Sequence, residues 1–314
     1  METLWYERLA GAFARATARL RPWYRWPFLI ALPSLVGLRV NMRHENLFDT
    51  ETAKAVRLEP PAGVDVRGAR TADGSFNDLG CPAMGRAGTR FGRNMPIAAT
   101  FGEEPPGLYE PNPREVSRRL LQRRSFVPVP HLSVLVPAWL QFMVHDWLSH
   151  GHSDTSRPPH DIPLPPGDDW PAPDMTVLRS LPDPPGPGDA GRPATYTNVE
   201  THWWDGSQIY GSSAERLAAV RRDPSTGQPR ADGKLPLDER GLLPVDPDGD
   251  IPDLELAGVN GNWWAGLSVM HTLFAREHNA IVDRLRIDFP DAEGEWLFQK
   301  ARLVNAALMA KIHT

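Results

Sequence analysis

The sequence predicts a mainly α-helical protein whose helices are joined by long irregular loops. Apolar residues recur at helical spacing in three long segments, residues 133–150, 264–286 and 293–313. Proline accounts for 33 of the 314 residues, which favours long irregular connections over compact strand–helix–strand units. The composition, 41% hydrophobic and 23% charged, is that of a globular chain long enough to bury a large core.

The first 43 residues form a basic, aromatic leader. Residues 4–21 have the spacing of an amphipathic helix, and an aromatic-rich connection follows them. Seven arginines stand in the leader against two glutamates. Its apolar run, residues 27–38, is too short to span a bilayer and contains Pro33. Such a leader either packs on its own domain, which is the alternative we favour, or makes peripheral contact with a membrane surface.

Loops interrupted by a few helices are expected between the leader and the closing helices. Residues 60–105 are rich in Gly, Pro, Asn and Asp and predict an extended loop. Residues 155–195 are a proline-rich excursion, which we expect to form a surface arm. The remaining expected elements are a helix at 113–123, a helix at 133–150 with Pro137 in its first turn, a polar–aromatic loop at 201–213, a short helix at 214–222 and a turn-rich segment at 223–262.

The last predicted helix carries an apolar stripe that continues to the end of the chain. No Gly, Asn or Pro stop signal follows this stripe. We therefore expect the chain to be cut inside its fold. The stripe consists of Ala301, Leu303, Val304, Ala307, Leu308 and Ile312.

Charge and cysteine content exclude two classes of protein. The net charge of −5 gives no global electrostatic support for a nucleic-acid groove, so no nucleic-acid partner is expected. The single cysteine, Cys81, excludes an internal disulfide framework and fits a reducing compartment. No secretory signal is evident, because arginines continue to Arg25 before the apolar run begins. We expect a cytoplasmic protein that is able to lie at the periphery of a membrane.

The helix expected at 133–150 carries the first candidate site residues. Gln141 and His145 lie one turn apart and share a face, whereas Asp146 points about 100° away. One helix could therefore offer an imidazole and an amide to a pocket and a carboxylate to a second site. On this helix alone, a core histidine bonded to a neighbouring carbonyl is the favoured alternative.

The loop at 201–207 carries candidate cation ligands. Thr201, Asp205 and Ser207 supply hard oxygen donors at alternating positions, and the backbone carbonyl of Trp203 is available between them. Calcium takes six to eight oxygen ligands of these kinds, and Asp146 could supply a further carboxylate. The alternative is a hydrogen-bonded turn with aromatic anchors.

Several segments resemble known proteins in the same order along the chain. The segments 141–147, 203–212 and 270–279 resemble those of animal-type haem peroxidases and cyclooxygenases. The resemblance is closer to plant-type and bacterial fatty-acid α-dioxygenases, and it covers nearly the whole chain. The segments that resemble this branch are 70–78, 88–94, 264–268, 301–304 and 310–314.

This resemblance implies a haem peroxidase-like helical fold, with a leader at residues 1–45 and a partial catalytic domain at residues 46–314. It implies that His145 is the distal histidine above the haem and that Gln141 is its companion. It also implies that calcium is bound by Asp146, Thr201, the carbonyl of Trp203, Asp205 and Ser207.

Two departures from the peroxidase branch matter. Val144 stands where an aspartate can esterify haem, so we expect non-covalent haem b. Peroxidases carry a distal arginine before the Met-His block, but no arginine occurs between Arg240 and Arg276. Without that cation, oxygenation is favoured over efficient peroxidase turnover.

The resemblance also implies that functional groups of the family lie beyond Thr314. These are the axial histidine, the radical tyrosine and the arginine that anchors the fatty-acid carboxylate. The five tyrosines of the chain lie in segments that do not match the radical site, and His313 belongs to an earlier helix than the axial ligand. We therefore expect a distal half that binds haem poorly and is inactive alone.

The complete relative is expected to form a 2-hydroperoxy acid from a fatty acid, dioxygen and a haem oxidised by peroxide. One alternative is a haem peroxidase that oxidises small reductants with peroxide. The other is a non-catalytic half that needs a separate carboxyl-terminal partner.

Three histidine- or aspartate-rich patterns are expected to be structural. The His150–Asp154 pattern lacks the further histidine of a zinc site and follows a helix end. His271 and His278 share an apolar helix face and are expected to be buried. The acidic residues at 246–250 lack a closing glutamate and are expected to form a turn.

Overall fold

The computed structural model describes residues 4–45, 57–93, 97, 100, 105–173, 175–186, 188–247, 249 and 252–314, with only the backbone described for residues 43–45. The chain divides into two compact units. We call one the hairpin unit (Met1–Glu51, Phe91–Gly102 and Pro185–Ala194) and the other the helical unit (Thr52–Arg90, Glu103–Pro184 and Thr195–Thr314).

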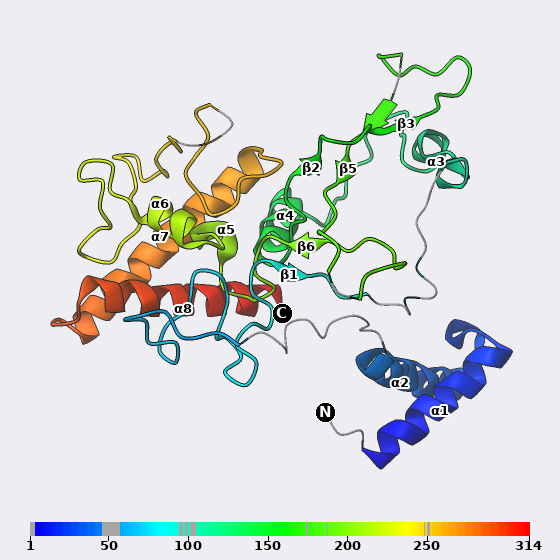
Figure 1. The fold of residues 1–314 in the computed structure, drawn as a ribbon, viewed down its shortest axis with the longest axis horizontal. Coiled ribbons are helices and arrows are strands. Elements are labelled where there is room, and N and C mark those ends of the chain that lie inside the picture. The colour runs from blue at the N-terminus through cyan, green and yellow to red at the C-terminus, as the bar shows by residue number, and fades with distance from the viewer. Residues whose placement is uncertain are drawn as a thin grey trace. The chain divides into compact units, whose positions relative to one another are not determined.

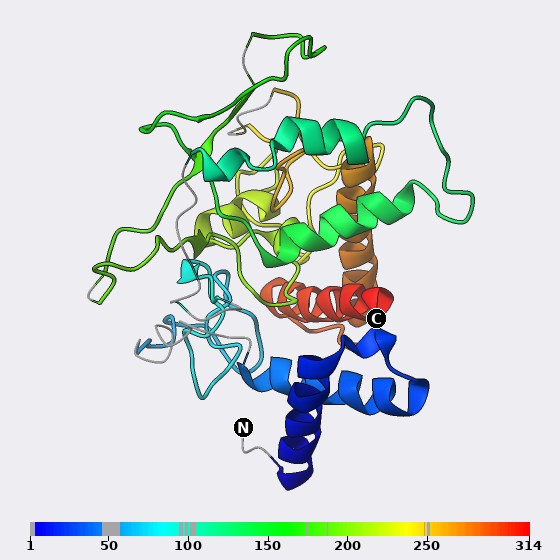
Figure 2. The same ribbon diagram turned by 90° about the vertical axis from the view of Figure 1, so that its right-hand side faces the viewer.

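The helical unit is built around α4 (Leu135–Trp147), α7 (Ala265–Asp288) and α8 (Gly294–His313) (Figure 1). Helix α7 packs against both α4 and α8, and the view in Figure 2 shows α7 and α8 crossing from a second direction. Two short helices, α5 (Ser207–Tyr210) and α6 (Ala214–Arg221), follow the predicted cation loop.

The core of the helical unit lies where these helices meet. Phe142 of α4 stacks on Phe274 of α7 with ring centroids 5.2 Å apart. Both side chains are almost wholly removed from water, and each contributes on the order of 2 kcal/mol through that burial. The other large buried members are Met143, Ile209, Tyr210, Leu235, Leu267, Met270, Phe298 and Met309.

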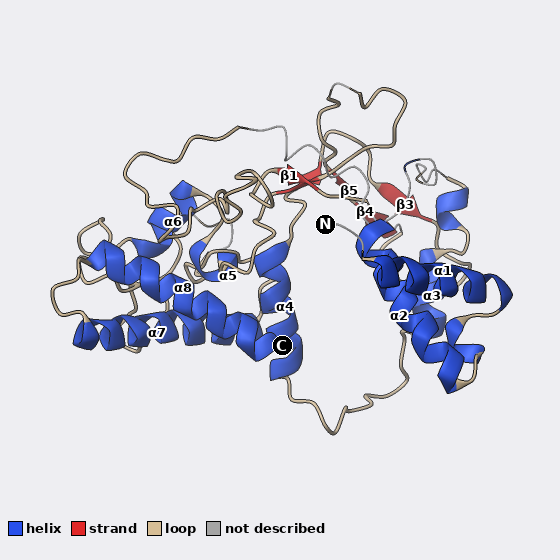
Figure 3. Ribbon diagram, turned by 90° about the horizontal axis from the view of Figure 1, so that it is seen from below, coloured by secondary structure: helices blue, strands red, loops and turns tan. Residues whose placement is uncertain are grey.

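Strands are few and short, as Figure 3 shows. They form three antiparallel pairs in the described part of the chain: β1 (Thr89–Arg90) with β6 (Thr197–Asn198), β2 (Ser153–Asp154) with β5 (Arg179–Ser180), and β3 (His160–Ile162) with β4 (Met175–Val177). The proline-rich segment 155–195 therefore contains strands that its composition did not predict. Ladders of two or three residues are too short to show an alternating pattern.

The predicted mainly helical fold with long loops is confirmed. The helices expected at 113–123, 133–150 and 214–222 appear as α3 (Pro113–Leu120), α4 and α6. Asn112 caps α3, because its side-chain oxygen accepts from the backbone N–H groups of Arg114 and Glu115.

The hairpin unit contains a helix that the sequence analysis missed. The amphipathic helix expected at 4–21 appears as α1 (Trp5–Leu20), and a single turn of 3-10 helix follows at Trp23–Arg25. After this turn the chain forms α2 (Phe28–Glu45), a helix that was not predicted and that contains Pro33. Proline removes one backbone hydrogen bond within a helix, but here α1 packs along α2 and supports it. Among the described residues, no helix is both long enough and apolar enough to cross a membrane.

Candidate active site

Helix α4 carries the predicted Gln141, which the structure ties to the segment before α7. The Nε2 of Gln141 donates to the backbone oxygen of Asn262 at 2.9 Å. The indole nitrogen of Trp264 donates to the Oε1 of Gln141 at 2.7 Å. Because both ends of the amide are engaged, the side chain is fixed in direction.

His145 lies one turn further along α4 and is half-buried. Burial, together with the nearby His271, lowers the pKa of its imidazole to about 4, and a hydrogen bond with the backbone of Val259 opposes the shift. Its Nδ1 is buried without a hydrogen-bond partner among the described residues. At neutral pH, His145 is therefore an uncharged imidazole that can accept a proton.

A buried carboxylate–histidine pair lies near His145. The Nδ1 of His271 is 3.1 Å from an oxygen of Glu255, whose other oxygen accepts from Trp263 at 2.8 Å. The ring of His271 is fully buried and lies 5.7 Å from the ring of Phe142. The expectation that His271 is buried is confirmed, but its link to Glu255 was missed. Glu255 lies in a turn-rich segment without periodicity, so no sequence signal connects it with α4.

The four side chains among the predicted cation ligands come together at a second site. Thr201 and Ser207 both donate through their hydroxyls to one oxygen of Asp205, at 3.0 and 2.8 Å. The backbone N–H of Ser207 donates to Asp146 of α4 at 2.6 Å. All four side chains have an exposed fraction of 1% or less. This cluster joins the loop to α4 through groups that are 61 positions apart.

Trp203 anchors the same loop through its ring. The indole nitrogen donates to the backbone oxygen of Met84 at 2.9 Å. Gly85, with a φ of +66°, lies so close that an added Cβ would approach the indole nitrogen to 2.8 Å. A residue larger than glycine is therefore disfavoured at position 85 by both backbone conformation and space.

The electrostatics of the cluster favour a cation. Burial raises the pKa of Asp146 well above its usual range, and the neighbouring Asp205 carboxylate raises it further. Burial also raises the pKa of Asp205, whereas the positive charge of Arg302 opposes this. One carboxylate oxygen of Asp205 is buried without a hydrogen-bond partner among the described residues. Two buried carboxylates, one of which has an oxygen without a hydrogen-bond partner among the described residues, and two hydroxyls form a donor set that suits calcium.

Arg302 of α8 supplies a compensating positive charge. It lies in the resembling segment 301–304, but the sequence indicated no role for it. Its side chain is fully buried, and its guanidinium lies 5.2 Å from the ring centroid of Tyr210. One of its nitrogens donates to the backbone oxygen of Thr71 at 3.3 Å. Its Nε and Nη2 have no hydrogen-bond partner in the part of the chain that the structure describes.

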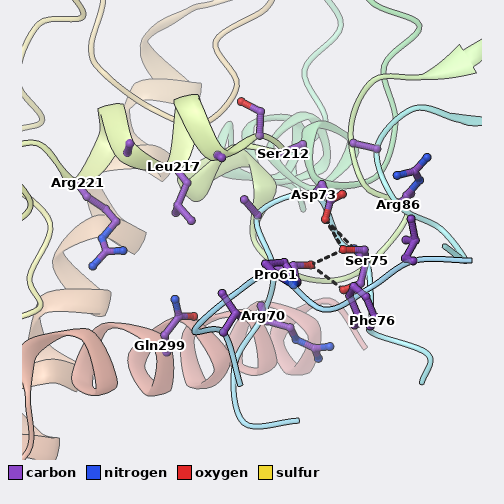
Figure 4. A pocket seen from close by; sticks show the side chains of 18 of the residues that line it. Pro61, Arg70, Asp73, Ser75, Phe76, Arg86, Ser212, Leu217, Arg221 and Gln299 are labelled. Atoms are coloured by element: carbon purple, nitrogen blue, oxygen red, sulfur yellow. Dashed lines mark hydrogen bonds between the residues drawn. The ribbon is translucent and has the colours of Figure 1, made fainter. Parts of the chain in front are cut away.

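Thr71 also lines the cavity shown in Figure 4, which measures about 780 Å³. Loop residues such as Phe76 and Arg86 form one wall, and Leu217 of α6 and Gln299 of α8 line the rest. None of the predicted site residues lines this cavity.

The other sequence patterns remain structural. No cluster of three or more histidine, cysteine or acidic side chains suited to a metal occurs among the described residues. Asp154 pairs with Arg157, and Asp246 pairs with Arg216 at 2.6 Å. Asp248 and Asp250 lie outside the described residues. His278 is fully buried, as expected, and its ring nitrogens meet the hydroxyl of Tyr210 and a backbone oxygen.

Residues 69–314 match the animal haem peroxidase family. Because this match covers most of the chain, the chain belongs to that family.

Within the family, the chain is similar to plant α-dioxygenases. It is 36% identical over 299 residues to the α-dioxygenase PIOX of Nicotiana tabacum, a match that covers 94% of this chain and 43% of the relative. The crystal structure of the fatty acid α-dioxygenase of Arabidopsis thaliana superimposes with a TM-score of 0.78 and 32% identity, covering 99% of this chain and 46% of the other. A variant of the Oryza sativa enzyme solved with palmitic acid superimposes with a TM-score of 0.76 and 30% identity, covering 100% of this chain and 48% of the other. The chain thus spans about half the length of the relatives it matches.

Proposed function

We propose that this chain carries the haem-distal and calcium-binding half of a fatty-acid α-dioxygenase. The observation that supports the proposal most strongly is the dual use of α4. The helix presents uncharged His145 on one face and delivers fully buried Asp146 to the carboxylate cluster on another. A cation bound to that cluster would hold the loop at 201–207 against α4 and thereby fix the position of His145.

Haem b is the proposed cofactor, and the surface around His145 suits it. Leu140 and Val144 of α4 are one turn apart and are 52% and 41% exposed. These apolar side chains lie beside Gln141 and His145 and would be covered by a flat, apolar macrocycle. Val144 offers no carboxylate for an ester link, which supports non-covalent binding. When bound, haem supplies the redox chemistry of peroxide activation.

His145 acts in this scheme as a proton carrier. Its low pKa keeps the imidazole free to take a proton from a hydroperoxide and return it to the departing oxygen. Gln141 stays in one orientation beside it, because Trp264 and the backbone of Asn262 hold its amide.

A long-chain fatty acid is the proposed substrate, with dioxygen as co-substrate. The palmitic acid in the structure of the Oryza sativa relative supports this choice. The absence of an arginine between Arg240 and Arg276 supports oxygenation over peroxidase turnover, since no guanidinium from that segment can stabilise a departing hydroxide.

Product analysis tests the proposal. A polypeptide containing these residues and the carboxyl-terminal half of the relatives is incubated with haem, palmitic acid and a trace of peroxide. We expect a 2-hydroperoxy acid and fatty-acid-dependent oxygen uptake. Oxidation of guaiacol that needs no lipid, without a hydroperoxy product, would identify a peroxidase instead.

A further inference from the structure

The two helices of the hairpin unit meet through small and polar groups. Gly11 and Ala14 of α1 are buried against α2. A Cβ added to Gly37 would lie 2.0 Å from the backbone oxygen of Ala10, so the two backbones approach closely. Asn41 of α2 donates to the backbone oxygen of Gly11 at 3.1 Å. The interface between α1 and α2 therefore uses few large apolar side chains.

The large apolar side chains of α1 lie on the opposite side. At about 100° per residue, they fall within an arc of about 100° that does not include Gly11 or Ala14. Their exposed fractions run from 42% to 75%. These residues are Trp5, Tyr6, Leu9, Phe13 and Leu20.

On α2 too, the large apolar side chains lie opposite the interface, so the apolar faces of the two helices point away from each other. The buried positions of α2, Ser34 and Gly37, are small. Its large apolar side chains gather on the other side of the helix, with exposed fractions between 41% and 85%. They are Phe28, Leu29, Leu32, Leu35, Val36 and Met42.

The charged side chains of the two helices and their turn are mostly arginines. Among the described side chains of residues 4–42, six exposed arginines stand against a single acid, Glu7. Arg21 and Arg25 lie at the turn between the helices, next to Trp26 and Tyr24 respectively, with ring contacts of 5.6 and 5.9 Å. The other four are Arg8, Arg15, Arg19 and Arg39.

We propose that α1 docks in the plane of an anionic lipid surface, with its outward apolar face in the acyl boundary and the arginines of α1 and of the following turn on the headgroups. An in-plane arrangement fits, since among the described residues no helix could cross a bilayer. Tryptophan and tyrosine at the rim of an apolar face are typical of membrane interfaces. Arginine rather than acid around that face selects anionic lipid over a neutral or basic protein surface. This inference does not depend on the proposed function.

Vesicle sedimentation with the full chain tests the proposal. Vesicles of phosphatidylcholine with 30% phosphatidylglycerol are compared with vesicles of phosphatidylcholine alone. We expect the chain to partition onto the anionic vesicles at least about tenfold more strongly, and the difference to shrink at high salt. Equal or absent binding to both kinds of vesicle would overturn the proposal.

A matched pair of variants locates the binding surface. Leu20 on α1 and Leu120 on α3 are both 75% exposed. We expect Trp5→Ser with Leu20→Ser to weaken vesicle binding at least about tenfold, since two large apolar groups no longer leave water. Leu120→Ser should leave binding unchanged. Circular dichroism checks that the exposed substitutions preserve the helices.

Sedimentation velocity without lipid tests whether a second copy of the chain covers this face instead. A monomer whose vesicle binding is lost in the double variant supports docking on lipid. A dimer that the double variant dissociates would show that a second copy of the chain covers this face, and would overturn the proposal.

Discussion

His145 and His278 show how one physical effect serves two different purposes. Burial lowers the pKa of both imidazoles to about 4. His278 is enclosed and bonded to Tyr210, so its neutrality only stabilises the core. His145 is half-buried and its Nδ1 has no hydrogen-bond partner among the described groups, so its neutrality leaves a ring nitrogen that can accept a proton.

The buried His278 gives a pH prediction. Its folded pKa lies below the usual value of 6.5, so the unfolded chain binds the proton more readily. The stability it contributes is fully present above pH 6.5 and is lost as the pH falls towards 4. We expect His278→Gln to flatten the decline in unfolding free energy between pH 7 and pH 4 by about 3 kcal/mol. Urea unfolding of the wild type and the variant at pH 7 and pH 4 measures this difference. The same decline in unfolding free energy in both proteins would contradict the prediction.

Arg302 gives a second prediction at the scale of single residues. Its removal leaves Asp146 and Asp205 buried with less compensating charge. We expect Arg302→Met to lower the unfolding free energy by about 3–5 kcal/mol in chelator, and calcium to restore part of the loss. Arg240→Met, at a side chain that is 80% exposed, should behave like the wild type. Equal stability of the two variants in chelator would contradict the role given to Arg302.

At the scale of elements, periodic segments were predictable and short or interrupted ones were not. Helices α4, α7 and α8 have long apolar patterns, and the structure differs from the expected ranges by only a few residues at their ends. Helix α2 was missed because Pro33 interrupts its pattern and because its large apolar residues are exposed, whereas the apolar face of a helix is normally buried. The short strands carry too few residues to show any period.

The link between α4 and the loop at 201–207 leads to a prediction about cation removal. We expect saturating calcium to raise the Tm of the chain by roughly 5 °C, because a ligand that binds only the folded state stabilises it. The effect should weaken as the pH falls, since the raised pKa values of Asp146 and Asp205 make protons compete with the cation.

Asp205→Asn should abolish the calcium response, whereas Asp238→Asn, in a turn outside the cluster, should retain it. Differential scanning calorimetry with calcium and with chelator makes the comparison. An undiminished response in Asp205→Asn would place the cation elsewhere.

At the scale of the whole molecule, the order of short segments along the chain carried the family assignment. The polar residues of α4 and of the loop at 201–207 could be predicted to meet, because the family pattern joins them across about sixty positions. Glu255 and Arg302 could not be predicted to join the site. Their contacts with His271 and Thr71 depend on how α7 and α8 pack. Arg302 lies in the resembling segment 301–304, but nothing in the local sequence of either residue indicates its partner.

The most direct test of the central claim is fatty-acid-dependent oxygen uptake by a polypeptide that contains these residues together with the carboxyl-terminal half of the relatives. Wild type, His145→Ala and the control His152→Ala, at an exposed histidine outside the site, are compared with haem and palmitic acid. Because His145 is the proposed proton carrier, we expect His145→Ala to lose about 100-fold or more in rate and His152→Ala to keep most of it. Uptake that is equally fast in His145→Ala and His152→Ala would contradict the account.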